Sequence, residues 1–272
     1  MEASSRVALV QARERLSERT QGAAGSDLLA LADELFAVAR LLQAQPSLRR
    51  ALADPSGKPE ERAALAQRLF SSRLQPAALD ILEVTVRQRW SRPLDMVEAA
   101  TTLATEAALD AADARGELDD VEDELFRFGR IVAGDQGLSR ILSDRTGSAE
   151  GKSALLDQLL SGRVSPVTEQ LLRNVLTGSH VGTAGVAIER LSDVASRRRG
   201  QSIARVTTAA PLTPAQEQRL TESLGRLYGR TIGLHVTVDP TVLGGLLVQV
   251  GDEVIDGTIA HRLEAARRQL DG

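Results

Sequence analysis

The stretch that decides the fold occurs twice in this chain. Residues 31–57 read LADELFAVARLLQAQPSLRRALADPSG, and residues 121–147 read VEDELFRFGRIVAGDQGLSRILSDRTG. The two stretches align without a gap at a shift of 90 positions, and identical pairs continue at this shift as far as Pro76 and Pro166. A repeat of this length exceeds the units of solenoid proteins, so we interpret it as a duplicated domain.

Each copy carries the periodicity of α-helices. Apolar residues at spacings of three and four predict a helix over 31–42 and a counterpart over 121–132. Breaks at 54–57 and 144–147, which contain Gly with Pro, Ser or Thr, indicate connections to the next helix. A further helix is expected after Pro76 and after Pro166, because proline is tolerated in a first helical turn. Each copy is therefore predicted to be a small antiparallel helical bundle.

The composition is that of a folded, non-disordered chain with more than one folding unit. It has 272 residues, of which 42% are apolar and 26% charged, and only 2% are aromatic. We therefore expect two or three units with cores of Leu, Val, Ile and Ala. The net charge of −4 argues against a nucleic-acid partner, since binding to phosphates needs a basic surface. The absence of Cys excludes disulfides, thiolate metal sites and a Cys nucleophile.

We expect neither a targeting segment nor a membrane-spanning one. The first 20 residues carry charges throughout and lack the apolar stretch of a signal peptide. The strongest apolar run, 243–250, is far shorter than the roughly 20 residues of a spanning helix. Any membrane association should therefore come through partners.

The chain changes character after Gly200, where strand signals begin. Three segments rich in β-branched or alternating apolar residues predict strands, and the last of them continues through Gly251-Asp252 into a hairpin. Thr213-Pro214-Ala215-Gln216 has the pattern of a capping box and predicts a helix that runs to about Tyr228. A last amphipathic helix carries Ile259 and Leu263 on one stripe with Ala266 and Leu270. The predicted strands are 203–208, 232–238, 246–250 and 253–255.

The predicted fold class is mainly α, with two tandem helical bundles followed by a small mixed α+β unit. We expect three domains, namely a first bundle at 1–108, its duplicate at 109–200 and the α+β unit at 201–272.

Two charged segments have more than one interpretation. Residues 106–124 hold nine acidic residues and one Arg, which fits a solvated helix face with an acidic first turn. A basic partner and a divalent ion are the alternatives, although the spaced pattern of a calcium loop is missing. Arg197 to Arg199 followed by Gly200 predict a helix end with glycine as a left-handed cap, and a phosphate or lipid-headgroup patch is the alternative.

No motif in the chain indicates catalysis, a cofactor or a metal. The glycines of GGLLVQVGDEVIDG lack the order of a phosphate loop and are interpreted as turn glycines. Asp252 and Asp256 could form a general acid and base pair, but an aspartate beside a turn glycine usually caps backbone N–H groups. The single tryptophan, Trp90, is interpreted as a packing anchor or a partner contact. The three histidines lack metal-ligand spacing and are His180, His235 and His261.

Asp239-Pro240, Gly244-Gly245, Gly251-Asp252 and Asp256-Gly257 follow one another near the C-terminus. This order of motifs resembles the delta subunit family of F-type ATP synthase, which includes the mitochondrial oligomycin-sensitivity-conferring protein. DELFRFGRIVAGDQGLSRILSDRTG in the second copy is similar to the N-terminal bundle of the same family. The chain is some 90 residues longer than the common form, which the duplication accounts for. The motif residues, to which we assign a structural role, are Asp239, Pro240, Gly244, Gly245, Gly251, Asp252, Asp256, Gly257 and Arg262.

The resemblance implies a non-catalytic stator subunit that holds the headpiece against rotor torque during proton-driven ATP synthesis. It implies that the helical part binds N-terminal segments of alpha subunits and that the C-terminal unit binds the peripheral-stalk b subunit. It also implies a place at the cytoplasmic face of the cell membrane, reached only through the complex, with no cofactor. The first helix lacks the Tyr and Phe usual in the family, so the copy that binds alpha stays open. A free-standing helical scaffold that bridges protein partners is the alternative function.

Overall fold

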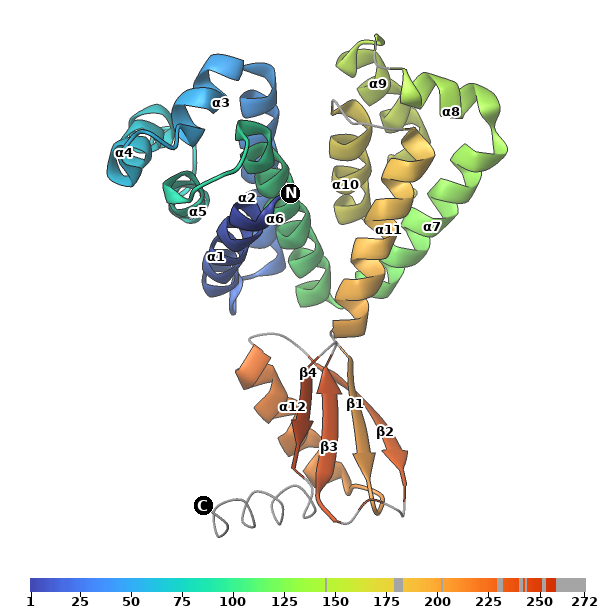
Figure 1. The fold of residues 1–272 in the computed structure, drawn as a ribbon. Coiled ribbons are helices and arrows are strands. Elements are labelled where there is room, and N and C mark those ends of the chain that lie inside the picture. The colour runs from blue at the N-terminus through green and yellow to red at the C-terminus, as the bar shows by residue number, and fades with distance from the viewer. Residues whose placement is uncertain are drawn as a thin grey trace. The chain divides into compact units, whose positions relative to one another are not determined.

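The computed structural model describes residues 1–257 except 145, 179–182, 202, 229–231, 240, 241, 243, 251 and 252. The chain forms two compact units, Met1–Ser192 and Asp193–Gly272. The described residues form twelve helices and a four-stranded sheet near the C-terminus (Figure 1). The predicted fold class, mainly α with a small α+β unit, is therefore confirmed.

The helices repeat with the period seen in the sequence. Three helices of the first copy recur 90 residues later with the same lengths, so that α3, α4 and α5 correspond to α8, α9 and α10. Prolines open α5 and α10, as predicted. The helices are α1 Ala3–Thr20, α2 Gly25–Ala44, α3 Pro46–Ala53, α4 Pro59–Phe70, α5 Pro76–Arg87, α6 Pro93–Arg115, α7 Leu118–Gly134, α8 Gln136–Ser143, α9 Ala149–Leu160, α10 Pro166–Thr177 and α11 Ala184–Gln201.

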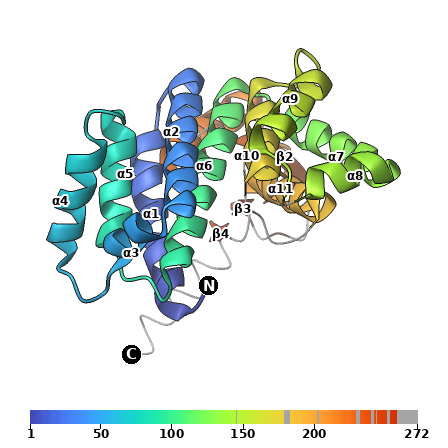
Figure 2. The same ribbon diagram turned by 90° about the horizontal axis from the view of Figure 1, so that it is seen from above.

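Helix α6 belongs to both copies. As the last helix of the first copy it packs along α2, and both helices contribute Ala and Leu to the buried contact. The 90-residue shift also carries α1 onto 93–110, the first part of α6. Accordingly, α6 contacts α10 just as α1 contacts α5. Figure 2 shows α2 and α6 between α5 on one side and α10 on the other. The first unit thus consists of two bundles with one helix in common: α1–α6, and α6 to the first half of α11.

A buried cation joins two helix ends at the same position of each copy. Arg62 on α4 is 6% exposed and donates to five backbone carbonyls around the C-terminal ends of α3 and α5, over 2.7 to 3.3 Å. Its counterpart Lys152 on α9 donates to the carbonyls of Leu142 and Leu176 at 2.9 and 3.4 Å. Helix C-termini present unpaired carbonyls and partial negative charge, so a cation is favourable there.

Trp90 is a packing residue. Its side chain is 3% exposed and belongs to the apolar core of the first bundle. Its indole Nε1–H donates to the carbonyl oxygen of Thr85 at 2.9 Å, which satisfies the one polar atom of the buried ring. Of the two predictions for this residue, the packing anchor is confirmed.

The helix ends within one residue of the predicted position, but the predicted left-handed cap at Gly200 is wrong. Helix α11 continues through Gly200 to Gln201, and Gly200 does not adopt the left-handed conformation. The arginines nevertheless lie in the last turn of α11, where cations offset the helix dipole. A glycine with a left-handed backbone does cap another helix, because Gly116 has φ 70° at the end of α6.

The C-terminal unit contains a mixed sheet with one helix on it. The strands are β1 Ile203–Thr208, β2 Gly233–Val238, β3 Leu246–Val250 and β4 Glu253–Asp256, in the order β2-β1-β3-β4. β1 pairs parallel with β2 and antiparallel with β3, and β3 pairs antiparallel with β4. Helix α12, Pro214–Tyr228, contributes Leu220 and Leu224 to the core on one face of the sheet.

The predicted capping box at the start of α12 is confirmed. The N–H of Thr213 donates to Oε1 of Gln216 at 2.8 Å, and the N–H of Gln216 donates to Oγ1 of Thr213 at 3.4 Å. The strands agree with the predicted segments within a residue. The turn at Gly251-Asp252 and the predicted last helix lie outside the described residues.

The predicted domain boundaries fall inside helices. The boundary at 108/109 lies within α6, and the one at 200/201 lies within α11. The division into three domains stays a prediction.

Candidate partner-binding surfaces

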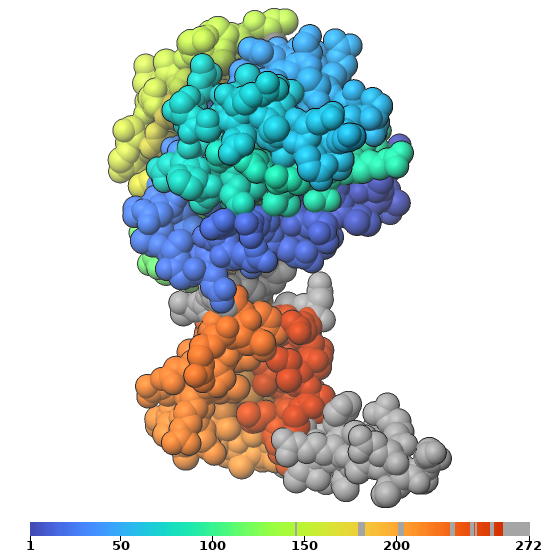
Figure 3. Space-filling view, turned by 90° about the vertical axis from the view of Figure 1, so that its left-hand side faces the viewer, coloured from blue at the N-terminus to red at the C-terminus, as the bar shows by residue number. Residues whose placement is uncertain are grey.

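The first candidate surface is formed by α1 and α5, on the side of the first unit seen in Figure 3. Helix α1 buries a narrow stripe of small side chains and Leu16. On its outer side, Val7 is 65% exposed and Val10 is 49% exposed, one turn apart. Neighbouring exposed apolar residues on a helix that also carries charged groups are typical of a docking surface.

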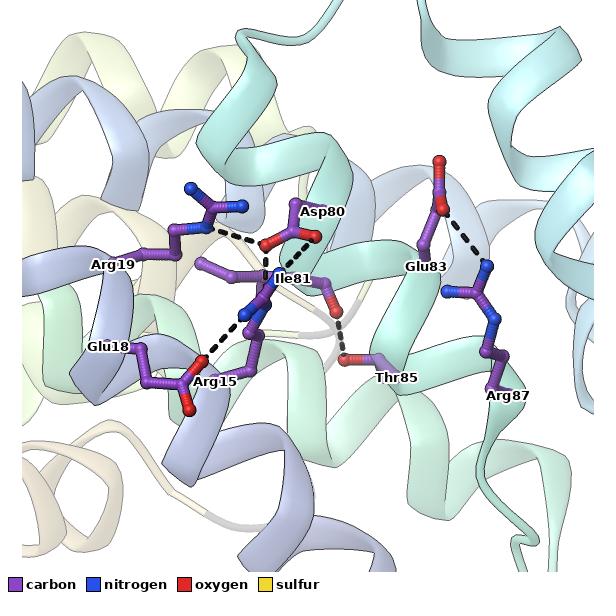
Figure 4. A network of polar contacts seen from close by, with 8 residues as sticks. All are labelled: Arg15, Glu18, Arg19, Asp80, Ile81, Glu83, Thr85 and Arg87. Carbon is purple, nitrogen blue, oxygen red and sulfur yellow. Dashed lines mark hydrogen bonds and ion pairs between the residues drawn. The ribbon is translucent and has the colours of Figure 1, made fainter.

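Charged residues connect α1 to α5 beside this surface (Figure 4). The Asp80 carboxylate accepts from Arg15 at 2.6 and 2.9 Å and from Arg19 at 2.7 Å, and Arg15 also pairs with Glu18 at 2.6 Å. Burial alone would raise the pKa of Asp80, but the hydrogen bonds and charges of the two arginines outweigh it and lower this pKa. The hydrogen bond from Arg15 to Asp80 is also the main reason that the pKa of Arg15 is raised.

In the second copy the corresponding face of α10 is covered by α2. Gln170, the counterpart of Asp80, donates its Nε2–H to the carbonyl oxygen of Leu29 at 3.2 Å. Asn174, the counterpart of Val84, accepts a hydrogen bond from Arg40 through Oδ1. A helix of the first copy thus lies where the first copy itself has an open surface.

A polar cleft of about 590 Å³ lies beside this contact, between α2 and the pair α9 and α10. Arg173 lines it and pairs with Asp157 and Glu169 at 2.5 and 2.6 Å, and these contacts raise the pKa of Arg173. Of the charged residues that line the cleft, Arg173 and Glu169 are therefore paired with each other.

The second candidate surface is the face of the sheet that α12 leaves open. Alternate strand residues point away from α12, and the strand register brings them into two rows. None of these residues belongs to the core of the described part of this unit. The first row is His235, Arg205, Gln249 and Val254, and the second is Thr237, Thr207, Leu247 and Asp256.

Several of the predicted motif residues gather at one end of the sheet. The N–H of Asp239 donates to the carbonyl of Thr208 at 2.8 Å, and that of Gly257 donates to the carbonyl of Leu246 at 2.9 Å. Gly244 and Gly245, which precede β3, have φ of 65° and 82°. These values lie in the left-handed region, where glycine has no steric penalty.

Of the five remaining motif residues, one lies among the described residues and four lie outside them. Asp256 ends β4 and lies opposite Leu247. Pro240, Gly251, Asp252 and Arg262 lie outside the described residues, and so do His180 and His261. The Asp252 and Asp256 pair therefore stays an untested alternative.

The acidic stretch 106–124 spans the end of α6 and the start of α7. Among its partnered members, Glu106 pairs with Arg13 at 2.6 Å and Glu124 accepts from the N–H of Ser165 at 3.0 Å. The contact between Glu124 and Ser165 was not predicted from the sequence, although the repeat could have indicated it. Glu34, the counterpart of Glu124, accepts from the N–H of Gln75 at 2.9 Å at the start of α5.

The described residues contain no group of three or more His, Cys, Asp or Glu that could hold a metal ion. No helix in the described ranges has the length and apolarity needed to cross a bilayer.

Comparison with known proteins identifies relatives over the whole chain. A family model described as "ATP synthase delta (OSCP) subunit" matches residues 104–270, so the match begins within α6 and includes α7 to α11. The "ATP synthase subunit delta" of Streptomyces avermitilis is 48% identical over 267 residues, which are 98% of this chain and 97% of that protein. That of Streptomyces griseus is 45% identical over 272 residues, all of both chains. That of Nocardia farcinica is 44% identical over 272 residues, or 99% of this chain and all of that one. The chain therefore belongs to the ATP synthase delta (OSCP) subunit family, whose members are non-catalytic structural subunits.

Proposed function

We propose that this chain is the stator link of an F-type ATP synthase, attached to the membrane only through the complex. Its helical unit holds N-terminal segments of alpha subunits, and its C-terminal unit holds the end of the peripheral-stalk b subunit. The observation that carries the proposal is that each of the two compact units has a surface that its described residues leave uncovered. Two attachments on one chain raise the effective concentration of the second, so modest contacts give a durable link.

The first copy is the one that holds the alpha segment. In the second copy the face of α10 is already occupied by α2 through Leu29 and Arg40. The equivalent face at α1 and α5 carries the exposed Val7 and Val10. Because a helix of this chain rests on that face in the second copy, an amphipathic helix is the partner that suits it in the first.

The C-terminal unit holds the stalk on its open sheet face. This face combines a central Arg205 with Leu247 and the exposed Val254, so it can bury apolar side chains of a helix and pair with its carboxylates. Location at the cytoplasmic side of the membrane follows from the same assignment.

Point variants of the full chain test the two attachments separately. Val7→Glu with Val10→Glu should weaken binding of an alpha N-terminal peptide at least tenfold in calorimetry, because a charge would be buried at the contact. Leu247→Glu should weaken binding of the b subunit and leave the peptide unaffected. Leu69→Glu on α4, 41% exposed, is the matched control for both. A truncation after Gln201 should lose b and keep the peptide. If the truncated chain still binds b with full affinity, the assignment of the second unit is wrong.

The alternative of a free-standing scaffold makes a different prediction. Such a chain would not co-purify with ATPase activity when a tagged version is isolated from detergent-solubilised membranes. Stoichiometric co-purification supports the stator proposal, and its absence would exclude it.

A further inference from the structure

The two copies differ on one face of their first long helix. In α2 the residues Leu29, Asp33, Phe36 and Arg40 follow one another at spacings of four, three and four, so they lie on one face. Leu29 and Arg40 bind α10 on this face, and Phe36 between them is 2% exposed. Helix α10 therefore contacts this face of α2 at both ends, while Asp33 and Arg40 stay exposed beside the cleft.

The corresponding face of α7 has no such cover among the described residues. The 90-residue shift places Asp119, Asp123, Phe126 and Arg130 on it. Phe126 is 56% exposed, against 2% for Phe36, whereas Arg130 and Arg40 are both exposed. The second copy thus keeps the aromatic residue and the arginine of a docking face that the first copy uses internally. A Phe that is more than half exposed leaves a large apolar area in water.

We propose that this face of α7, centred on Phe126 and Arg130, binds a helix of another polypeptide in the way that α2 binds α10. The internal contact defines the chemistry of that helix. The partner helix presents a carboxamide or carboxylate to Arg130, as Asn174 presents its amide oxygen to Arg40. It places apolar or small side chains over Phe126. Near the acidic start of α7 it carries an amide or basic donor, in the position that Gln170 takes against Leu29.

A second copy of this chain is not the occupant. The helix that it would offer is α5, the counterpart of α10. There Val84 replaces Asn174 and has no acceptor for Arg130. Asp80 replaces Gln170 and is already bound by Arg15 and Arg19. Head-to-tail association through this face would therefore leave the arginine without its partner.

Labelling of single cysteines tests the proposal, because the chain has no cysteine of its own. Phe126→Cys is treated with a maleimide in the free chain and in the detergent-purified ATP synthase that contains it. The labelling rate should fall at least tenfold in the complex. Leu69→Cys on α4, which is 41% exposed and off this face, should react at the same rate in both. Equal rates at position 126 in the two samples would overturn the proposal.

A photoreactive benzophenone maleimide on Phe126→Cys then identifies the occupant. The expected product joins this chain to a helical segment of a different polypeptide that has Asn, Gln, Asp or Glu within one turn of the cross-link. Arg130→Glu should reduce its yield several-fold while the chain stays in the complex. A cross-link to a second copy, or within the chain, refutes the proposal. If alpha and b co-purify while position 126 stays reactive, this inference fails and the stator function stands. If the chain does not co-purify with ATP synthase, the stator function fails first.

Discussion

The buried cations Arg62 and Lys152 allow a prediction in which each copy is the control for the other. Arg62→Met keeps the apolar length of the side chain and removes all five hydrogen bonds. The carbonyl of Val86 stays buried and loses its partner, which costs about 1–3 kcal/mol, and the four part-buried carbonyls add roughly 0.5–1 kcal/mol each. With some recovery from hydration and from better apolar packing, the expected loss is about 3–5 kcal/mol.

Lys152→Met removes two hydrogen bonds, and the one to Leu176 is long at 3.4 Å. The expected loss is about 1–3 kcal/mol, smaller than for Arg62 because fewer carbonyls lose a donor. We therefore expect Arg62→Met to lower the stability more than Lys152→Met does.

Hydrogen exchange on the full chain measures both losses locally, since a chain of several units does not unfold in one step. Arg62→Met should accelerate exchange of the slowest amides in α3, α4 and α5 by about a hundredfold or more, at about 1.4 kcal/mol per factor of ten. Lys152→Met should act on α8, α9 and α10 with a smaller factor. Arg68→Met, an exposed change on α4, should alter exchange little. If Arg62→Met proves no more disruptive than Arg68→Met, or less disruptive than Lys152→Met, the reasoning from hydrogen-bond number is wrong.

Three further predictions concern single contacts. The folded-state pKa of Asp80 is lowered, so its stabilisation of α1 is present above the unfolded pKa of about 4 and is lost as pH falls through the folded value. Exchange in α1 should accelerate over that acidic range in the native chain, whereas Asp80→Asn should show the faster exchange already at neutral pH. Thr213→Ala should destabilise α12 by about 1 kcal/mol through loss of the cap, measured by exchange in that helix, and an unchanged α12 would count against it. Gly116→Ala should lower stability by about 1–2 kcal/mol because φ is 70°, whereas Gly134→Ala at a right-handed position should be neutral or stabilising in thermal melts.

Most of the fold could be predicted because the repeat and the local signals agree. The gap-free shift of 90 residues implied matching helices, and the observed bounds of α3 to α5 and α8 to α10 follow it. Thr213 and Gln216 predicted the start of α12 correctly, because a capping box is a contact between near neighbours in the sequence. Only the left-handed conformation predicted for Gly200 was wrong, since a glycine with helical φ and ψ costs only about 1 kcal/mol and the neighbouring helical residues decide its conformation.

The surfaces could not be predicted to the same extent, because they depend on contacts between distant residues. Phe36 and Phe126 are identical in the alignment, yet one is buried and the other exposed. What separates them is the contact of α2 with α10, which joins residues more than 130 positions apart. Likewise, the sharing of α6 arises from packing and leaves little trace in its sequence.

The common helix α6 sets the increment by which such a chain can change length. One period adds five helices, because the last helix already in place serves as the first of the next bundle. Removing residues 21–110 would join α1 to the remainder of α6, so that α1 would take over its place against α10. A one-bundle protein and a two-bundle protein can therefore differ by a single in-frame segment, and neither needs a new terminal element to close its core.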